Sequence, residues 1–282
     1  MRISPRVEQK LAFVFIRGMG LIAITLPVFI AVYVLVEGLG AMNLAFFLTS
    51  PRGGISGEGG ISSCIVATLW LLAMTLLVLT PLGIGAGVYL AEYAPDNRLT
   101  RLIRYGVELL AGIPSIVFGL FGFALFVIAL RQGYSILAGS LTLAILLLPF
   151  LTRSTEEALR SVPRSFREAA FSLGATKWQT LRHVLFPAAL PGILTGVILC
   201  IGGALAESAP LWVTMGGSYE LPHSPLEPGR ALAVHIFYLA METRALDKAL
   251  ATGTVLVALI VMLNFLARWI SSAIRRTQWT PR

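Results

Sequence analysis

Residues 168–193 read EAAFSLGATKWQTLRHVLFPAALPGI and form a polar segment between two strongly apolar ones. Just before it, Pro163 and Ser165 can start a helix, and Ser165 with Glu168 has the S-x-x-E spacing of a capping box. Gly174 suits the left-handed conformation that ends such a helix, because glycine has no side chain to clash there. The sequence therefore predicts a short helix that begins near Pro163 and ends at Gly174.

A second short helix is predicted directly after the first. Thr176 and Gln179 repeat the capping spacing. The helix should run from Lys177 to about Leu185 and stop before Pro187, because the residue before a proline is disfavoured in helical conformation. Together the two helices predict a helix-turn-helix. Capping residues alone are also compatible with a loop that only connects two neighbouring elements.

The composition places the chain in a membrane. Its mean hydropathy is +0.82, 56% of its residues are hydrophobic and only 13% are charged. A soluble domain of 282 residues could not cover so much apolar side chain with so little polar surface. We therefore expect an all-α integral membrane protein, with lipid as the solvent of most of its surface.

Six apolar stretches are long enough to cross a hydrocarbon core of about 30 Å, for which a helix needs about 20 residues. They cover residues 13–36, 62–90, 107–130, 135–152, 188–215 and 250–270. The second and fifth exceed the length of a straight span and contain glycine and proline, which predicts a tilt, a kink or a buried break. The first follows basic residues, as a secretory signal does, but its apolar core is too long and no convincing cleavage site follows it. We therefore expect a membrane span there too.

Basic residues gather on one side of these six spans. If both termini are cytoplasmic, 17 of the 22 Lys and Arg residues fall in cytoplasmic segments or their flanks. Because cytoplasmic loops carry an excess of Lys and Arg, this distribution predicts that both termini lie in the cytoplasm. The basic residues are spread over four segments and do not gather with aromatic residues on one face. The sequence pI near 10.0 therefore does not indicate binding of nucleic acid.

Several kinds of chemistry lack their motifs in this sequence. The two cysteines, Cys64 and Cys200, and the three histidines have no metal-ligand or redox spacing. No G-x-x-x-x-G-K-[ST] loop occurs, so we expect that the chain does not hydrolyse ATP. We therefore predict a chain that is not an enzyme and that holds neither a metal nor a cofactor.

The predicted helix-turn-helix resembles the cytoplasmic coupling loop of ABC-importer permeases. In that pattern Glu-Ala-Ala is followed by a glycine four residues later and by a proline about thirteen residues beyond it. The matching residues are Glu168, Ala169, Ala170, Gly174 and Pro187. The resemblance implies the type I (MetI-like) ABC-importer permease fold, with six transmembrane helices and cytoplasmic coupling helices. It also implies which residues couple the chain to an ATPase: Glu168, Ala169, Ala170, Gly174, Ala175 and Thr176.

Other stretches are similar to the permease pair of phosphate importers. They are LAEYA at 90–94, AGIPSIVFGLFG at 111–122, LLLPFLTRSTEEALRSVP at 146–163 and AESAPL at 206–211. Two more are closer to the A-type than to the C-type member of that pair: GGISGEGGISSCIVATL at 53–69 and LAVHIFYLA at 232–240. The sequence departs from the family at Gly203, where an arginine commonly stands, and this argues against an arginine contact with the anion at that site.

This resemblance implies the permease subunit of an ATP-driven importer of inorganic phosphate, which forms half of the translocation path. Its implied partners are a sister permease of the C-type, a dimer of ATP-binding subunits that uses ATP and Mg²⁺, and a phosphate-binding protein. The implied location is the bacterial cytoplasmic (inner) membrane. Sulfate, molybdate or phosphonate is the alternative substrate. A secondary transporter or a membrane-embedded enzyme is the alternative class, which a single glutamate in the outer half of one span supports poorly.

Two groups of charged residues are candidates for a gate or for the translocation path. Glu207 lies in the fifth predicted span, where a carboxylate is costly and should face the interior or water. We expect it to pair with Arg230, with Arg131 or with a base of the sister permease and to hold the outer gate closed; solvation at a frayed helix end is the alternative. The second group ends the fourth span, where it forms either a charged collar at the inner mouth or only an interfacial anchor. It consists of Arg153, Glu156 and Glu157.

The chain is predicted to have three units and no second soluble domain. Residues 1–61 hold the first transmembrane helix and an outer loop, residues 62–271 form the permease core with five transmembrane helices, and residues 272–282 form a cytoplasmic tail. The coupling loop covers residues 153–187 of the core.

Overall fold

Helices make up nearly all of the computed structural model, which describes residues 5–52 and 57–278. Along these residues the elements, with π-helical turns named η, are α1 (Pro5–Leu39), α2 (Leu44–Leu48), α3 (Ser62–Val88), η1 (Tyr89–Tyr93), α4 (Arg98–Ala111), α5 (Ser115–Gly122), η2 (Phe123–Ala129), α6 (Ile136–Arg160), α7 (Arg164–Ser172), α8 (Lys177–Thr180), η3 (Leu181–Leu185), α9 (Phe186–Ala206), α10 (Ala209–Thr214), α11 (Leu232–Glu242) and α12 (Leu246–Gln278). Residues 1–4 of the first predicted unit and residues 279–282 of the third lie outside the described residues.

Five helices of the described residues are long and apolar enough to cross a membrane, and a bent pair of helices can supply a sixth span. The five are Gln9–Leu39, Ser62–Tyr93, Ile136–Arg160, Lys177–Ala206 and Leu246–Trp269. Each overlaps one of the predicted spans. The prediction of an all-helical membrane protein is therefore confirmed, with five spans or six.

The third predicted span, residues 107–130, is wrong as a continuous helix. Its place is taken by α4 and by the continuous helix α5–η2, which meet at 101°. The chain breaks there because Pro114 lacks an N–H and disfavours helical conformation at Ile113. Helix α4 is amphipathic, which favours a place at the membrane surface. At 1.5 Å per residue, α5–η2 is roughly 22 Å long, which is short for a full span.

The sequence predicts a tilt, a kink or a buried break in both the second and the fifth span, but the structure of the two spans differs. Helix α3 contains Pro81 but continues through η1 without a break. Its Gly83 and Gly87 instead allow close packing on α6, because a Cβ atom at either position would collide with Leu151 or Thr155. Glycine at these two positions therefore lets α3 and α6 approach closely.

The fifth predicted span, residues 188–215, does break. Helix α9 ends at Ala206, Glu207 is extended with φ −72° and ψ 133°, and α10 begins at Ala209. A continuous helix would need an N–H of Pro210 to bond to the Ala206 carbonyl, and proline has none. Glu207 therefore lies at the end of a helix and not within one.

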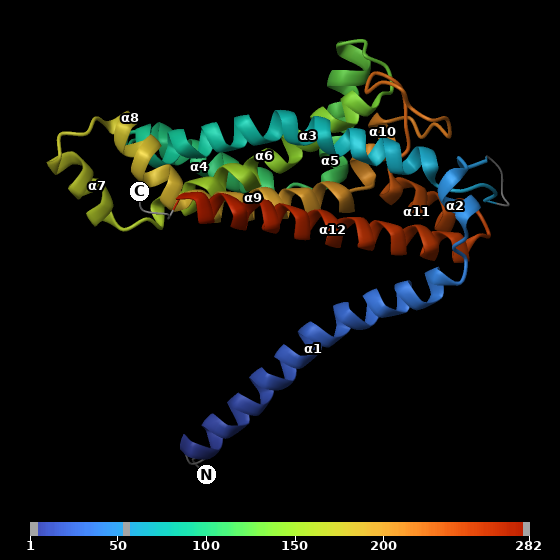
Figure 1. Cartoon of the computed structure of the whole chain (residues 1–282), viewed down its shortest axis with the longest axis horizontal. Coiled ribbons are helices and arrows are strands. Elements are labelled where there is room, and N and C mark those ends of the chain that lie inside the picture. Colours follow the sequence, from blue (N-terminus) through green and yellow to red (C-terminus); the bar gives the residue numbers. More distant parts are fainter. Residues whose placement is uncertain (1–4, 53–56, 279–282) are drawn as a thin grey trace.

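Different elements lie at the two ends of the helical bundle (Figure 1). Helices α7 and α8 lie at one end, where the last described turns of α12 and the first turns of α1 also point. Helices α2 and α11 and the segment 216–230 lie at the opposite end. The bundle core between them is apolar and is formed mainly by α3, α6, α9 and α12.

Helix α1 leaves the bundle after a short contact with α12 (Figure 1). The contact is close at Gly38, where a Cβ atom would collide with Thr254, and the Thr254 hydroxyl donates to the carbonyl of Val34 at 2.8 Å. No part of the most apolar stretch of α1 is buried within this chain. Its apolar surface therefore faces lipid or another chain.

Candidate functional site

The first helix of the predicted helix-turn-helix, α7, ends as the sequence predicts. Gly174 has φ +79°. Its N–H donates to the carbonyl of Phe171 at 2.9 Å, and the N–H of Ala175 donates to the carbonyl of Ala170 at 3.1 Å. These two bonds are those of a Schellman motif, in which a left-handed residue closes the helix. The left-handed turn predicted at Gly174 is confirmed.

Only one of the two predicted capping boxes forms. Thr176 accepts from the N–H of Gln179 at 3.3 Å, and the Gln179 side chain accepts from the N–H of Thr176 at 2.8 Å. The box predicted for Ser165 and Glu168 is wrong, because α7 begins at Arg164, two residues earlier than that pattern requires. Pro163 occupies the capping position and offers no side-chain acceptor.

The prediction that the second helix stops before Pro187 is wrong. Helix α8 passes through η3 into α9, and one continuous helix covers Lys177–Ala206. In η3 the N–H of Phe186 bonds to the carbonyl of Leu181, five residues back. Proline is tolerated next to this wider turn, in the first turn of α9. The surface helix is therefore a rigid extension of a membrane span.

The helix pair α7–α8 presents apolar side chains to its surroundings. Leu173 is 88% exposed and Trp178 is 58% exposed. A groove of about 390 Å³ runs beside them, lined by Ser165, Phe166, Ala169, Ala170, Leu173 and Val184. Glu168 is exposed, and its side chain forms no ion pair within the part of the chain that the structure describes. Exposed apolar patches beside a free charge are typical of protein docking surfaces.

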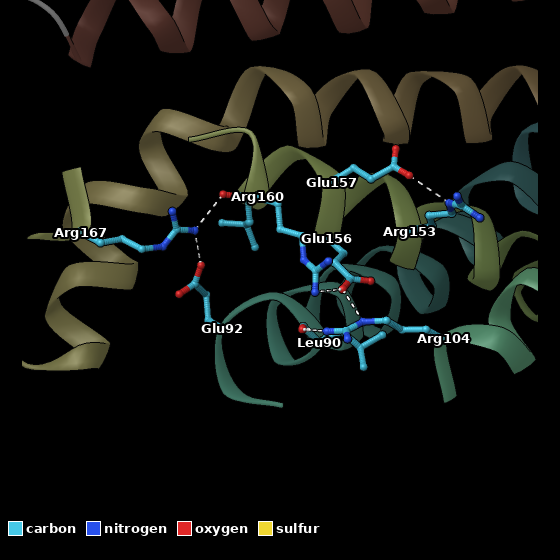
Figure 2. A network of polar contacts seen from close by, with 9 residues as sticks. Leu90, Glu92, Arg104, Arg153, Glu156, Glu157, Arg160 and Arg167 are labelled. Atoms are coloured by element: carbon cyan, nitrogen blue, oxygen red, sulfur yellow. Dashed lines mark hydrogen bonds and ion pairs between the residues drawn. The ribbon is translucent and has the colours of Figure 1, made fainter. Parts of the chain in front are cut away.

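A half-buried ion pair fastens α7 to the end of α3–η1 (Figure 2). Nη2 of Arg167 donates to Oε1 of Glu92 at 2.6 Å, and the two side chains are 21% and 10% exposed. The same guanidinium donates to the carbonyls of Val162 and Leu159, each at 3.0 Å. The Leu159 carbonyl can accept this hydrogen bond because Pro163, four residues further along the helix, has no N–H to donate to it. Arg167 therefore joins three segments at one point.

A second ion pair joins α4, α6 and η1 (Figure 2). Oε1 of Glu156 accepts from Nε of Arg104 at 2.8 Å and from Nη2 of Arg160 at 2.9 Å. Nη2 of Arg104 also donates to the Leu90 carbonyl at 2.8 Å. That carbonyl lacks a helical donor because the N–H of Ala94 bonds to Tyr89 and the next residue is a proline. Here too a proline leaves an acceptor that an arginine satisfies.

Of the predicted collar residues, Arg153 and Glu157 contact each other, whereas Glu156 pairs with two other arginines. Glu156 is buried between two arginines. Arg153 is more than half exposed and contacts Glu157 at 2.9 Å and Glu108 at 3.1 Å. Both settings border a pocket of about 210 Å³. Sequence reasoning gave no role to the partners that complete this network: Glu92, Arg104, Glu108, Arg160 and Arg167.

The difference in burial predicts different effects of two neighbouring substitutions. Glu156→Ala leaves two arginines without their carboxylate and should cost about 1.5 kcal/mol, a figure reduced for partial exposure. This should lower the thermal unfolding midpoint of the purified protein by several degrees. Glu157→Ala removes only an exposed i,i+4 pair and should change the midpoint by less than about 1 °C. Equal midpoints for both variants in thermal unfolding would contradict the burial argument.

Glu207 is not paired with either arginine proposed for it. It forms no ion pair among the described residues. Arg131 stands at φ +53° in the turn after η2 and is exposed. Arg230 is 6% exposed and lies over the rings of Tyr219 and Tyr238, each 4.2 Å from its guanidinium carbon. The predicted pair with Arg230 or Arg131 is therefore absent.

Comparisons with known proteins agree on one family. The family described as binding-protein-dependent transport system inner membrane component matches residues 83–276. The chain is 37% identical to the probable ABC transporter permease protein YqgI of Bacillus subtilis, over 86% of this chain and 87% of that protein. It is 34% identical to the phosphate transport system permease protein PstA of Yersinia pestis, over 93% and 90%. A chain from the structure of a bacterial alginate ABC transporter in complex with an alginate-bound periplasmic protein superposes with a TM-score of 0.69, at 14% identity and 96% coverage of both chains.

These matches identify the fold and the family of the chain. The fold is that of the type I, MetI-like ABC-importer permeases. The chain is the non-catalytic permease component, without a cofactor of its own; the ATPase is a separate component, and transport depends on a binding protein. It is a multi-pass protein of the inner membrane. The chain therefore belongs to the family of inner-membrane permease components of binding-protein-dependent transport systems.

Proposed function

We propose that the chain is the A-type permease subunit of an ATP-driven importer of inorganic phosphate and forms half of its translocation path. The observation that carries this proposal is the 34% identity to a phosphate permease over 93% of the chain. A similar protein from Methanocaldococcus jannaschii, named a probable phosphate transport system permease, is 35% identical over 92% of the chain. Sulfate, molybdate or phosphonate remains the alternative substrate.

The helix pair α7–α8 is the proposed docking surface for the ATPase. The exposed Leu173 and Trp178 supply apolar contact, and Glu168 supplies an unpaired charge. The residues assigned to coupling surround the confirmed turn and the confirmed cap: Glu168, Ala169, Ala170, Gly174, Ala175 and Thr176. Movement of this pair would pass directly into α9, because α8, η3 and α9 are continuous. It would pass into α3 through the contact between Arg167 and Glu92.

Alternating access follows from these connections. When the ATPase subunits close on ATP, the docked helix pair moves with them as a rigid element and tilts α9 and α3 toward the outward-open state. Hydrolysis reverses the motion. The ion pairs of Glu156 and of Arg153 border the inner mouth and would rearrange between the two states. Glu207, at the end of α9, is the proposed outer gate residue, with a base of the sister permease as its partner.

The proposed orientation places α7–α8 and both chain termini in the cytoplasm. Three clusters of arginine lie at that end of the bundle: on α4, at the end of α6 and on α7–α8 (Figure 1). The first turns of α1 and the last described turns of α12 point to the same side. The proposed partners are a C-type sister permease, a dimer of ATP-binding subunits and a phosphate-binding protein.

Uptake of radiolabelled phosphate tests the substrate. Cells with the chain should accumulate phosphate at micromolar concentration, and cells without it should lose most of this uptake once other phosphate transporters are deleted. Excess sulfate or molybdate should not compete. Unchanged phosphate uptake in the deletion strain, or full competition by sulfate or molybdate, would move the substrate to another oxyanion.

A further inference from the structure

A pocket of about 470 Å³ lies where η1, the end of α6 and helix α7 meet. Arginine dominates its lining, which consists of Ala91, Arg160, Arg164, Arg167, Glu168 and Phe171. Of these six residues Glu168 alone is acidic. Guanidinium groups around one space repel one another unless negative charge lies between them. The composition of the lining therefore indicates an anionic ligand.

The carboxylates of the chain do not fully neutralise this cluster. Arg164 is exposed and forms no ion pair among the described residues. Glu156 is shared between two arginines. The arginines and carboxylates that line the pocket, or pair with a residue that does, number four against three: Arg104, Arg160, Arg164 and Arg167 against Glu92, Glu156 and Glu168. At least one positive charge is therefore left without a partner.

Two of the three lining arginines are held in place by bonds to the rest of the chain (Figure 2). The Arg167 side chain is 21% exposed and is fixed by Glu92 and by two backbone carbonyls. Nη2 of Arg160 contacts Oε1 of Glu156, whose side chain is 10% exposed, at 2.9 Å. Groups that are already ordered lose little conformational entropy when a ligand binds. The pocket is therefore largely preformed, and Arg164 supplies its free charge.

The pocket lies where two membrane-spanning helices end. The span Ile136–Arg160 ends at a lining residue, and Ala91 lies in the last turn of the span Ser62–Tyr93. In that turn Tyr89 is 54% exposed and Tyr93 is 41% exposed. Tyrosine is enriched at the depth of the lipid head groups, because its ring is apolar and its hydroxyl is polar. The pocket therefore lies at the depth of lipid head groups.

Helix α7 carries the pocket and the apolar groove on different faces. Its pocket residues follow the helical spacing i, i+3, i+4 and i+7, which places them on one face: Arg164, Arg167, Glu168 and Phe171. The groove takes the remaining side of α7, with Ser165, Phe166, Ala169, Ala170 and Leu173. A protein that fills the groove therefore need not cover the pocket.

We propose that this pocket binds the phosphate group of an anionic phospholipid from the leaflet next to α7–α8. Arg160 and Arg164 contact the phosphate oxygens, because guanidinium donors match a phosphate in geometry and charge. Phe171, which is 50% exposed, contacts the apolar part of the lipid below its head group. The lipid connects the end of α6 to α7. The proposal does not depend on which solute the chain carries, and the proposed orientation makes this leaflet the cytoplasmic one.

Photo-crosslinking tests the site. The purified importer complex is reconstituted in phosphatidylcholine with a trace of phosphatidylglycerol that carries a photoreactive group beside its head group, and mass spectrometry locates the label. The wild type should be labelled within residues 160–171. Arg164→Gln should lower this labelling about fivefold, the contribution of one basic residue near an anionic surface. Arg98→Gln, an exposed arginine on α4 outside the lining, is the matched control and should be labelled as the wild type is.

A second variant separates binding from a merely structural effect. Glu168→Gln should raise the labelling of residues 160–171 severalfold, because it removes a negative charge from the lining. A loosened helix would give no such gain. Excess unlabelled phosphatidylglycerol should displace the label, whereas excess phosphatidylcholine should not. Equal labelling of Arg164→Gln and the wild type, or equal displacement by the two lipids, would overturn the proposal.

Inorganic phosphate offers the same chemical group from solution. Added in excess, with chloride at the same ionic strength as the control, it should leave the label in place. Displacement by inorganic phosphate would overturn the choice of a lipid and make the pocket a site for the free anion. The labelling needs no transport. A chain that imports sulfate should therefore be labelled in the same way, so failure of the proposed function and failure of the lipid site are distinguishable.

Discussion

Arg167→Ala is expected to reduce ATP-driven uptake by about 100-fold while the chain still assembles with its ATPase. The substitution removes a 2.6 Å ion pair to Glu92 and hydrogen bonds to the carbonyls of Leu159 and Val162. Hydrogen bonds to charged groups contribute about 1.5–3 kcal/mol each. We therefore expect the substitution to raise the activation free energy of coupled transport by about 3 kcal/mol. Uptake and ATP hydrolysis are measured together, because an uncoupled importer should still hydrolyse ATP.

A double-mutant cycle tests whether the pair acts as one unit. Glu92→Ala should also impair uptake, and the double variant should be no worse than Arg167→Ala alone. The matched control is the exposed pair of Arg101 and Asp96, which lie 3.9 Å apart and whose side chains are 69% and 87% exposed. Arg101→Ala should leave uptake within about twofold of the wild type. Additive losses in the cycle would show that Arg167 and Glu92 act separately.

Leu173→Glu is expected to weaken binding of the ATPase by about 30-fold or more. Leu173 is 88% exposed beside the apolar groove of α7–α8. If the ATPase covers this side chain, a carboxylate there would be buried without a partner, and central contacts of this kind are worth about 2 kcal/mol or more. Co-purification of the ATPase with tagged chain measures the effect.

The matched control for this surface is Leu226→Glu. Leu226 is 65% exposed but lies in the segment 216–230, at the opposite end of the bundle. Its substitution should leave ATPase binding unchanged. Equal binding of the ATPase by Leu173→Glu and the wild type would place the docking surface elsewhere.

Local sequence patterns predicted the elements that depend on local chemistry. Hydropathy located the five long spans, because a helix in lipid must be apolar over its whole length. The turn at Gly174 and the cap at Thr176 were predictable because each depends on residues within one helical turn. The break before Pro210 follows from the missing proline N–H, although the sequence placed a single span across it.

Longer-range features could not be predicted in the same way. Glu92 lies 75 residues from Arg167, and Arg104 lies 52 residues from Glu156, and no spacing rule joins residues so far apart. The 101° bend at Gly112–Pro114 depends on where α4 finds a polar surface, which a window of hydropathy averages away. The passage of the helix through Pro187 required the wide turn η3, which has no sequence signature of its own.

The most direct test of the account is phosphate accumulation by proteoliposomes that contain this chain, its sister permease and the ATPase. The phosphate-binding protein is supplied at the end of the bundle opposite α7–α8, ATP is supplied on the side of α7–α8, and ionophores collapse all ion gradients. The account predicts that phosphate accumulates only when both ATP and the binding protein are present, and that Leu173→Glu abolishes it. Accumulation that needs an ion gradient and proceeds without ATP would contradict the account.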